Sequence, residues 1–377
     1  MPPLHRRNNR SCAAQQANTR EACPAFCPQQ QPGIHYCVVV PHDDAQAPPP
    51  SAPEHCALGP MPAYLFIADD CGALRVVDPT SNEVVACVQV DYPAGMAIDC
   101  DLRKLYVANE QGTSLTVLNT SNLQGLNCIA LQEYHNTYMT MQGELRSTRL
   151  AVNPNNHRVY IPQPGSGRLA VVNGFQDCLL DVVRVGGRPV VAAVNQRTNL
   201  VYVANHTNEI PVLNSNNNQV FACVSLPGDA GVKDVVVDNC DSRVYALRED
   251  GSVAVIDGAT NTLIESICPP DGAAALAVDQ SIGLLYFINA ARNAVLVYDT
   301  CTLEQIGRLD IPRSVCRCLA QLVVNTQTHL VYISDPPANK THVIDGGLNM
   351  PIAEIPAAGQ SMALHSCTQN CPICMRR

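Results

Sequence analysis

The stretch Leu105-Tyr106-Val107-Ala108-Asn109 decides the fold, because the chain returns to this pattern at nearly regular intervals. Each return is an apolar run centred on an aromatic residue. The seven central aromatic residues are Phe66, Tyr106, Tyr160, Tyr202, Tyr245, Tyr286 and Tyr332. Successive copies are therefore 40, 54, 42, 43, 41 and 46 residues apart. Short β-rich runs with a period near forty predict a radial β-propeller instead of a helical solenoid.

The unit around Tyr245 shows what one repeat contains. Four strand-like runs follow one another, at 235–238, 243–247, 251–257 and 262–267. Asp, Gly, Asn and Thr separate the runs, as expected of turns that need left-handed geometry or side chains that bond their own backbone. The sequence therefore predicts an all-β, seven-bladed propeller of four-stranded blades.

Ring closure can also be predicted, because the first repeat lacks an inner strand of its own. The run Met362-Ala363-Leu364 near the C-terminus has the pattern of the six other inner strands. We expect it to complete the first blade by pairing with the strands that begin at Tyr64, which would remove two exposed sheet edges. The chain then divides into a Cys/Pro-rich arm (1–60), the propeller (61–366) and a Cys-rich tail (367–377).

The repeat resembles the YVTN-type β-propeller repeats of surface-layer and periplasmic proteins. The resemblance rests on the Leu-Tyr-Val-Ala-Asn run and on a following Val-x-Val-Ile-Asp-x-x-Thr-Asn pattern, and it covers roughly residues 61–366. It implies a seven-bladed propeller, commonly extracytoplasmic and used for binding or scaffolding. It does not imply an activity, since propellers host unrelated functions. The arm and tail have no counterpart in this family.

Composition bounds the partners and the compartment. Only 15% of the 377 residues are charged and the net charge is −9, which argues against a nucleic-acid partner. No apolar run is long enough to span a bilayer, and residues 1–10 lack the apolar core of a secretion signal. Nineteen cysteines nevertheless favour an oxidising setting. We therefore expect a location outside the cell or on a particle surface, with the cytoplasm as the alternative.

A polar ring is expected at the mouth of the propeller channel, where propellers usually bind ligands. Its members end the central strands of the seven repeats: Asp69, Asn109, Gln163, Asn205, Arg248, Asn289 and Asp335. Asn and Asp are also common turn formers, and we favour that interpretation. The ring holds only two carboxylates, and Arg248 would repel a cation, so metal-dependent hydrolysis is not expected there. The chain also lacks a nucleophile elbow, a phosphate-binding glycine loop and a haem-attachment motif.

An insertion lengthens the step between Tyr106 and Tyr160. It contains two tyrosines, a histidine and two methionines, a composition typical of contact surfaces. The candidate interaction residues are Tyr134, His135, Tyr138, Met139 and Met141. A merely longer loop explains the insertion equally well.

Cysteines at the two chain ends form the third candidate site. They are Cys12, Cys23, Cys27, Cys37 and Cys56 in the arm, and Cys367, Cys371 and Cys374 in the tail. Because ring closure brings arm and tail to the same blade, these thiols are expected to form disulfides or a zinc site, and we favour disulfides. No other cofactor is expected. The odd number of cysteines suggests an intermolecular disulfide as a further hypothesis.

These observations favour a non-enzymatic, disulfide-stapled structural or protein-interaction propeller. We expect it to belong to an extracellular, surface, virion or spore-type assembly, with a protein or a second copy of the chain as partner. One alternative is a propeller enzyme, a lactonase-like hydrolase or quinoprotein-like oxidoreductase, with its site at the channel mouth. Another is an intracellular partner-binding propeller whose arm and tail are stapled by zinc.

Overall fold

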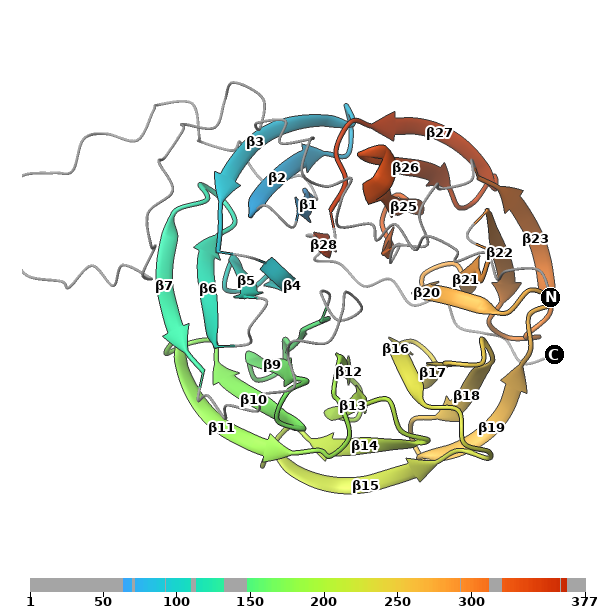
Figure 1. The fold of residues 1–377 in the computed structure, drawn as a ribbon, viewed down its shortest axis with the longest axis horizontal. Coiled ribbons are helices and arrows are strands. Elements are labelled where there is room, and N and C mark those ends of the chain that lie inside the picture. Colours follow the sequence, from blue (N-terminus) through green and yellow to red (C-terminus); the bar gives the residue numbers. More distant parts are fainter. Residues whose placement is uncertain are drawn as a thin grey trace, which may run out of the picture.

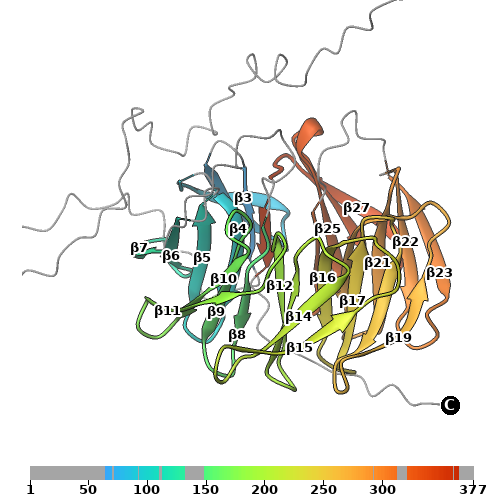
Figure 2. The same cartoon turned by 60° about the horizontal axis from the view of Figure 1, so that its bottom comes forward.

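Seven four-stranded antiparallel sheets stand in a ring around a central channel (Figure 1). The computed structural model describes residues 64–69, 72–91, 93–109, 113–131, 148–291, 293–311, 321–359 and 361–364. The strands of each blade run between the two faces of the ring (Figure 2). The predicted all-β, seven-bladed propeller is therefore confirmed. Among the described residues, none belongs to a helix with the length and apolar character needed to cross a membrane.

Each blade is built from four strands in radial order, from the channel outward. Blade 1 consists of β28 (Ser361–Leu364), β1 (Leu65–Ala68), β2 (Ala73–Asp78) and β3 (Glu83–Gln89), and blade 2 of β4 (Pro93–Asp99), β5 (Lys104–Asn109), β6 (Ser114–Asn119) and β7 (Gly125–Ala130). Blade 3 consists of β8 (Ala151–Asn153), β9 (Arg158–Gln163), β10 (Arg168–Asn173) and β11 (Cys178–Arg184). Blade 4 consists of β12 (Val191–Asn195), β13 (Leu200–Ala204), β14 (Glu209–Asn214) and β15 (Gln219–Ser225).

The last three blades repeat the same order. Blade 5 consists of β16 (Val232–Asp238), β17 (Arg243–Arg248), β18 (Val253–Asp257) and β19 (Thr262–Ile267). Blade 6 consists of β20 (Ala273–Asp279), β21 (Leu284–Asn289), β22 (Ala294–Asp299) and β23 (Gln305–Asp310). Blade 7 consists of β24 (Leu322–Asn325), β25 (Leu330–Asp335), β26 (Lys340–Asp345) and β27 (Met350–Ile355), with the short 3-10 helix η3 (Pro336–Ala338) after β25.

The ring closes in blade 1, as predicted. The C-terminal strand β28 pairs antiparallel with β1, with Leu364 opposite Leu65 and Ser361 opposite Ala68. In Figure 1 this red strand lies beside the blue strand β1, on the channel side. Blade 1 therefore joins the first and last strands of the propeller, and its inner strand is not left unpaired.

The hydrophobic core lies between the blades. The central aromatic residues Tyr106, Tyr160, Tyr202, Tyr245, Tyr286, Tyr332 and Phe66 are among the largest fully buried side chains. Each cluster of core residues joins two neighbouring blades: Tyr245 of blade 5, for example, packs in one cluster with Leu285 and Phe287 of blade 6. Burial of this apolar surface between sheets is the main force that holds the ring together.

A turn between the inner and second strands recurs at one face of the ring. In several blades the residue four positions after the end of the inner strand has a left-handed backbone. Examples are His157 (φ 53°), Asn199 (φ 55°) and His329 (φ 60°). Asn and His tolerate this conformation better than most non-glycine residues. The turn thus places a polar side chain against the neighbouring blade.

Candidate functional site

The predicted polar ring lies at one face of the propeller, because all seven residues end or directly follow the second strand of their blades. Three of these side chains stabilise the next turn. Asn109 Oδ1 accepts a hydrogen bond from the Thr113 backbone N–H at 2.9 Å. Asn289 Oδ1 accepts one from Asn293 N–H at 3.0 Å, and Asp69 Oδ1 accepts one from Ala73 N–H at 2.8 Å. The turn-forming role favoured from the sequence therefore has direct geometric support at these positions.

The remaining members of the ring are mostly buried. Arg248 donates hydrogen bonds to the carbonyl oxygens of Pro227 at 2.7 Å and Ala230 at 3.2 Å. The Asn205 amide donates to the carbonyl oxygen of Val185 at 3.3 Å. Gln163 and Asp335 are also buried. A ligand-binding role for this ring stays a prediction.

The other two predicted sites lie outside the described residues. These are the interaction loop (Tyr134, His135, Tyr138, Met139 and Met141) and the terminal cysteines (Cys12, Cys23, Cys27, Cys37, Cys56, Cys367, Cys371 and Cys374). Among the described cysteines, three have free thiols: Cys178, Cys223 and Cys268. The other described cysteines, Cys87, Cys100, Cys128, Cys240 and Cys301, are not among these free thiols. The predicted stapling of arm to tail stays a prediction.

An ion pair that the sequence analysis missed lies at the inner strands. Arg149 precedes β8, and its backbone N–H donates to the carbonyl oxygen of Val190 at 2.9 Å, beside blade 4. Its guanidinium forms an ion pair with Asp234 on β16 of blade 5 and donates to the carbonyl oxygen of Val235 at 2.6 Å. Burial raises the pKa of the Asp234 carboxyl, and Arg149 opposes that rise. The detectable signal was the charged pair Lys233-Asp234 inside a predicted inner strand, where the other repeats carry small apolar residues.

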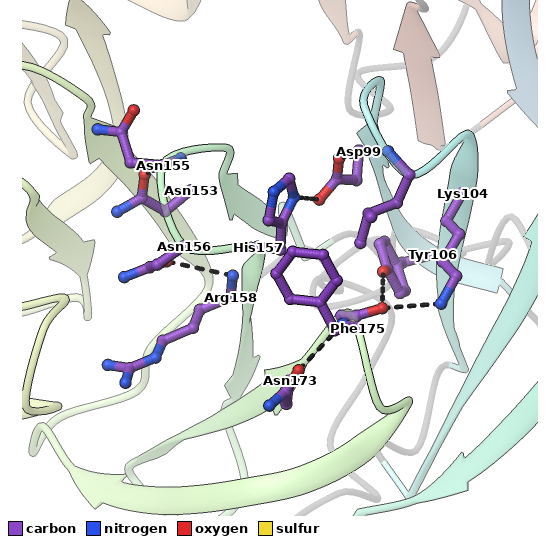
Figure 3. Close-up of polar contacts among 12 residues, drawn as sticks. Asp99, Lys104, Tyr106, Asn153, Asn155, Asn156, His157, Arg158, Asn173 and Phe175 are labelled. Atoms are coloured by element: carbon purple, nitrogen blue, oxygen red, sulfur yellow. Dashed lines mark hydrogen bonds and ion pairs between the residues drawn. The ribbon is translucent and has the colours of Figure 1, made fainter.

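A second cluster that the sequence analysis missed lies at the junction of blades 2 and 3 (Figure 3). It lies on the face opposite the polar ring, because Asp99 ends an inner strand, whereas the polar ring residues end or directly follow second strands. Asp99 ends β4, and its fully buried side chain approaches His157 of blade 3, with 2.7 Å between Oδ2 and Nδ1. Asp99 Oδ1 accepts a hydrogen bond from Leu102 N–H at 3.1 Å. The carboxylate of Asp101 completes the cluster, in which one potential ligand atom from each of Asp99, Asp101 and His157 lies within 4.8 Å of the others.

The surroundings of this cluster are held by further contacts between the same two blades. The ring of Phe175 meets that of His157 edge-on, with 4.4 Å between the ring centroids. Lys104 donates to the carbonyl oxygen of Gly174 at 2.7 Å and forms an ion pair with Asp177 at 2.8 Å. In Figure 3 Lys104 and Tyr106 both point toward the backbone beside Phe175. The junction is therefore rigidly positioned, and Lys104 is already neutralised by a partner other than Asp99.

Tyrosine hydroxyls connect other blades in the same way. Tyr160 donates to Ser215 Oγ at 2.7 Å, and Tyr202 donates to Asn261 Oδ1 at 2.7 Å. In each case the acceptor lies in the turn before the outer strand of the next blade. The repeated tyrosine, which marked the repeat in the sequence, thus also joins neighbouring blades.

Large apolar side chains are exposed on the outer strands, which form the rim of the ring (Figure 1). Every one of the seven outer strands carries at least one. They are Val85, Leu126, Leu180, Val220, Phe221, Ile264, Ile306, Met350 and Ile352. We call these residues the apolar rim. They are spread over all seven blades, with one or two on each outer strand.

Comparison with known proteins identifies the fold and no family. No protein-family model matches the chain, and no curated protein matches its sequence. Among solved structures, the chain is similar to one of Kuenenia stuttgartiensis hydrazine synthase, with a TM-score of 0.60 and 15% sequence identity. The match covers 72% of this chain and 89% of that chain. A likeness at this identity shows the shared fold alone, so membership of the YVTN-type family is not confirmed.

Proposed function

We propose that this chain is a non-enzymatic interaction propeller that assembles with protein through its apolar rim. The observation that carries the proposal is the exposed apolar residue on each outer strand. Phe221 is 62% exposed and Ile264 is 51% exposed, although both lie in regular strands of a large domain with a well-filled core. Burying such side chains against a partner would contribute roughly 25 cal/mol for each Å² of apolar area covered.

The expected partner is a second copy of the chain. The rim recurs around the ring, so one surface type offers several contact positions, as a building block of an assembly requires. The proposal extends to an oxidised extracellular or particle-surface assembly, which the nineteen cysteines support. The similar structure belongs to hydrazine synthase, which keeps a propeller enzyme as the alternative at the level of fold only.

Self-association of the purified full chain tests the proposal. Sedimentation velocity should show dimers or larger species in the wild type, and the double substitution Phe221→Ser with Ile264→Ser should shift them toward monomer. Leu348→Ser is the matched control, because Leu348 is 70% exposed but lies in the turn between β26 and β27, outside the rim. A monomeric wild type, or assembly that survives the rim substitutions, would overturn the proposal.

A further inference from the structure

We propose that Asp99, Asp101 and His157 form a zinc site that clips blade 2 to blade 3. Their side chains supply two carboxylate oxygens and one imidazole nitrogen within 4.8 Å of one another. Zn²⁺ binds Asp oxygen and His nitrogen at about 2.0–2.2 Å, and three protein ligands with one open position are a common set. The inference is independent of the proposed assembly role, because none of the three residues belongs to the apolar rim.

The corresponding junction between blades 6 and 7 gives an internal comparison. There Asp279 ends β20, and its Oδ2 lies 3.0 Å from Nδ1 of His329. Ser281 takes the place that Asp101 has in blade 2, two residues after the strand-ending aspartate. Its hydroxyl donates to Asp279 and lies 2.9 Å from the carbonyl oxygen of Thr326. Polar contacts among Asp279, Ser281 and His329 therefore join blade 6 to blade 7 without a cation. We call these three residues the polar latch.

Blade 2 differs by carrying a second carboxylate at that position. Asp99 is 1% exposed, whereas Asp101 is exposed, so placing this second carboxylate beside the buried one costs electrostatic free energy that solvent at Asp101 partly screens. Lys104 does not offset this charge, because Asp177 and the Gly174 carbonyl already bind it. One Zn²⁺ with two aspartates and a neutral histidine gives a site of zero net charge. A bound cation would therefore explain why blade 2 carries Asp101 at the position where blade 6 carries Ser281.

The donor set favours zinc over magnesium or calcium. Both of the latter prefer sites made of oxygen alone, whereas imidazole nitrogen suits transition metals. The edge-on contact of Phe175 shields one side of the imidazole, and the backbone N–H of Leu102 orients Asp99 from behind. Such outer contacts fix the ligands before the metal arrives.

Zinc binding by matched variants of the full chain tests the proposal. Asp101→Ser copies Ser281 of the other junction, and His157→Asn copies Asn199, which has the same left-handed backbone in blade 4. Equilibrium dialysis against Zn²⁺ with metal counting by mass spectrometry should show one zinc ion fewer in each variant than in the wild type. His329→Asn is the control and should keep the wild-type count. Cysteines elsewhere are common to all four proteins, so only differences between them are interpreted.

Thermal unfolding supplies the second readout. Added Zn²⁺ should raise the Tm of the wild type and of His329→Asn, and this rise should be lost in Asp101→Ser. Circular dichroism of the metal-free variants shows whether each is folded, and His157→Asn decides the matter if Asp101→Ser is not. Equal zinc counts in all four proteins, or equal Tm shifts, would overturn the site and leave polar contacts like those of the polar latch. Neither result bears on the rim, which these substitutions leave intact.

Discussion

Phe66 is the one member of the repeated aromatic set that lacks a hydroxyl group. In four of the other repeats this hydroxyl lies beside the residue after the third strand of the next blade: Tyr106 beside Gly174, Tyr160 beside Ser215, Tyr202 beside Gly258 and Tyr286 beside Gly346. A Cβ placed at Gly346 would lie only 2.3 Å from Tyr286 Oη, and one at Gly174 only 2.7 Å from Tyr106 Oη. The corresponding residue for blade 1 is Thr120. Its buried Oγ1 has no hydrogen-bond partner among the described residues.

Phe66→Tyr is therefore expected to stabilise the propeller. The added hydroxyl would meet Thr120 Oγ1, as Tyr160 meets Ser215 Oγ in blade 3. A hydrogen bond that satisfies a buried group contributes about 0.5–1.5 kcal/mol. Urea unfolding should show a higher midpoint with an unchanged slope.

Tyr160→Phe is the reverse experiment. It removes the hydroxyl from a position where the acceptor is present, so it should lower the free energy of unfolding by about 0.5–1.5 kcal/mol. If Phe66→Tyr destabilised the protein while Tyr160→Phe had no effect, the hydroxyl would not be the blade-to-blade contact inferred here.

Sequence reasoning at this scale located the residues better than their roles. The repeated tyrosine was found because periodicity is a one-dimensional signal. Its hydrogen bond to the next blade was not predicted, because that contact joins residues 55 to 68 positions apart and depends on how the sheets pack. The same limit hid the cluster of Asp99, Asp101 and His157, whose members come from two different repeats.

Strand β28 is the element on which ring closure depends. Met362 and Ala363 are buried, and they belong to two different core clusters, one on each side of blade 1. Three apolar residues sufficed to predict the strand, because six complete repeats defined what the seventh lacked. The strands could be predicted because each repeat could be compared with six others. The arm, the tail and the insertion each occur once, so their sequences could not be compared in this way.

Truncation tests this dependence. A chain ending at residue 360 lacks β28 and leaves the edge of β1 unpaired, whereas a chain ending at 366 keeps the strand and loses only the tail. We expect the shorter chain to lose at least about 3 kcal/mol, from the buried Met362 and the broken strand pairing. Light scattering should also detect aggregation through the exposed edge. Equal urea midpoints for the two truncations would show that closure does not need β28.

At the scale of the whole molecule, six buried tyrosines make the ring sensitive to alkaline pH. Burial raises the pKa of Tyr106, Tyr160, Tyr202, Tyr245 and Tyr286 above the usual value of 10, and it raises that of Tyr332 to about 12. In the unfolded chain these phenols titrate near pH 10. Above that pH the folded chain holds more protons than the unfolded chain, so unfolding releases protons and stability falls as pH rises.

The expected loss is about 1.4 kcal/mol per pH unit for each tyrosine until its folded pKa is reached. Because a domain is stable by only about 5–15 kcal/mol, several tyrosines together should unfold the propeller within a narrow range above pH 10. Urea midpoints at pH 9 and pH 11 measure the loss. The chain has twelve tyrosines, so the part of the tyrosinate absorbance that belongs to these six should appear together with the change in far-UV circular dichroism. Ionisation of more than six tyrosines with unchanged circular dichroism would contradict the prediction.

Tyr332→Phe provides the matched variant for this pH dependence. The Tyr332 hydroxyl is buried without a hydrogen-bond partner among the described residues, so its removal should cost little at pH 7. The variant also lacks one of the six protons that unfolding releases at high pH. Its stability should therefore fall less steeply between pH 10 and 12, by about 1.4 kcal/mol per pH unit. Equal slopes for the variant and the wild type would show that alkaline unfolding begins at other groups, such as the thiols, and not at the tyrosines that hold the blades together.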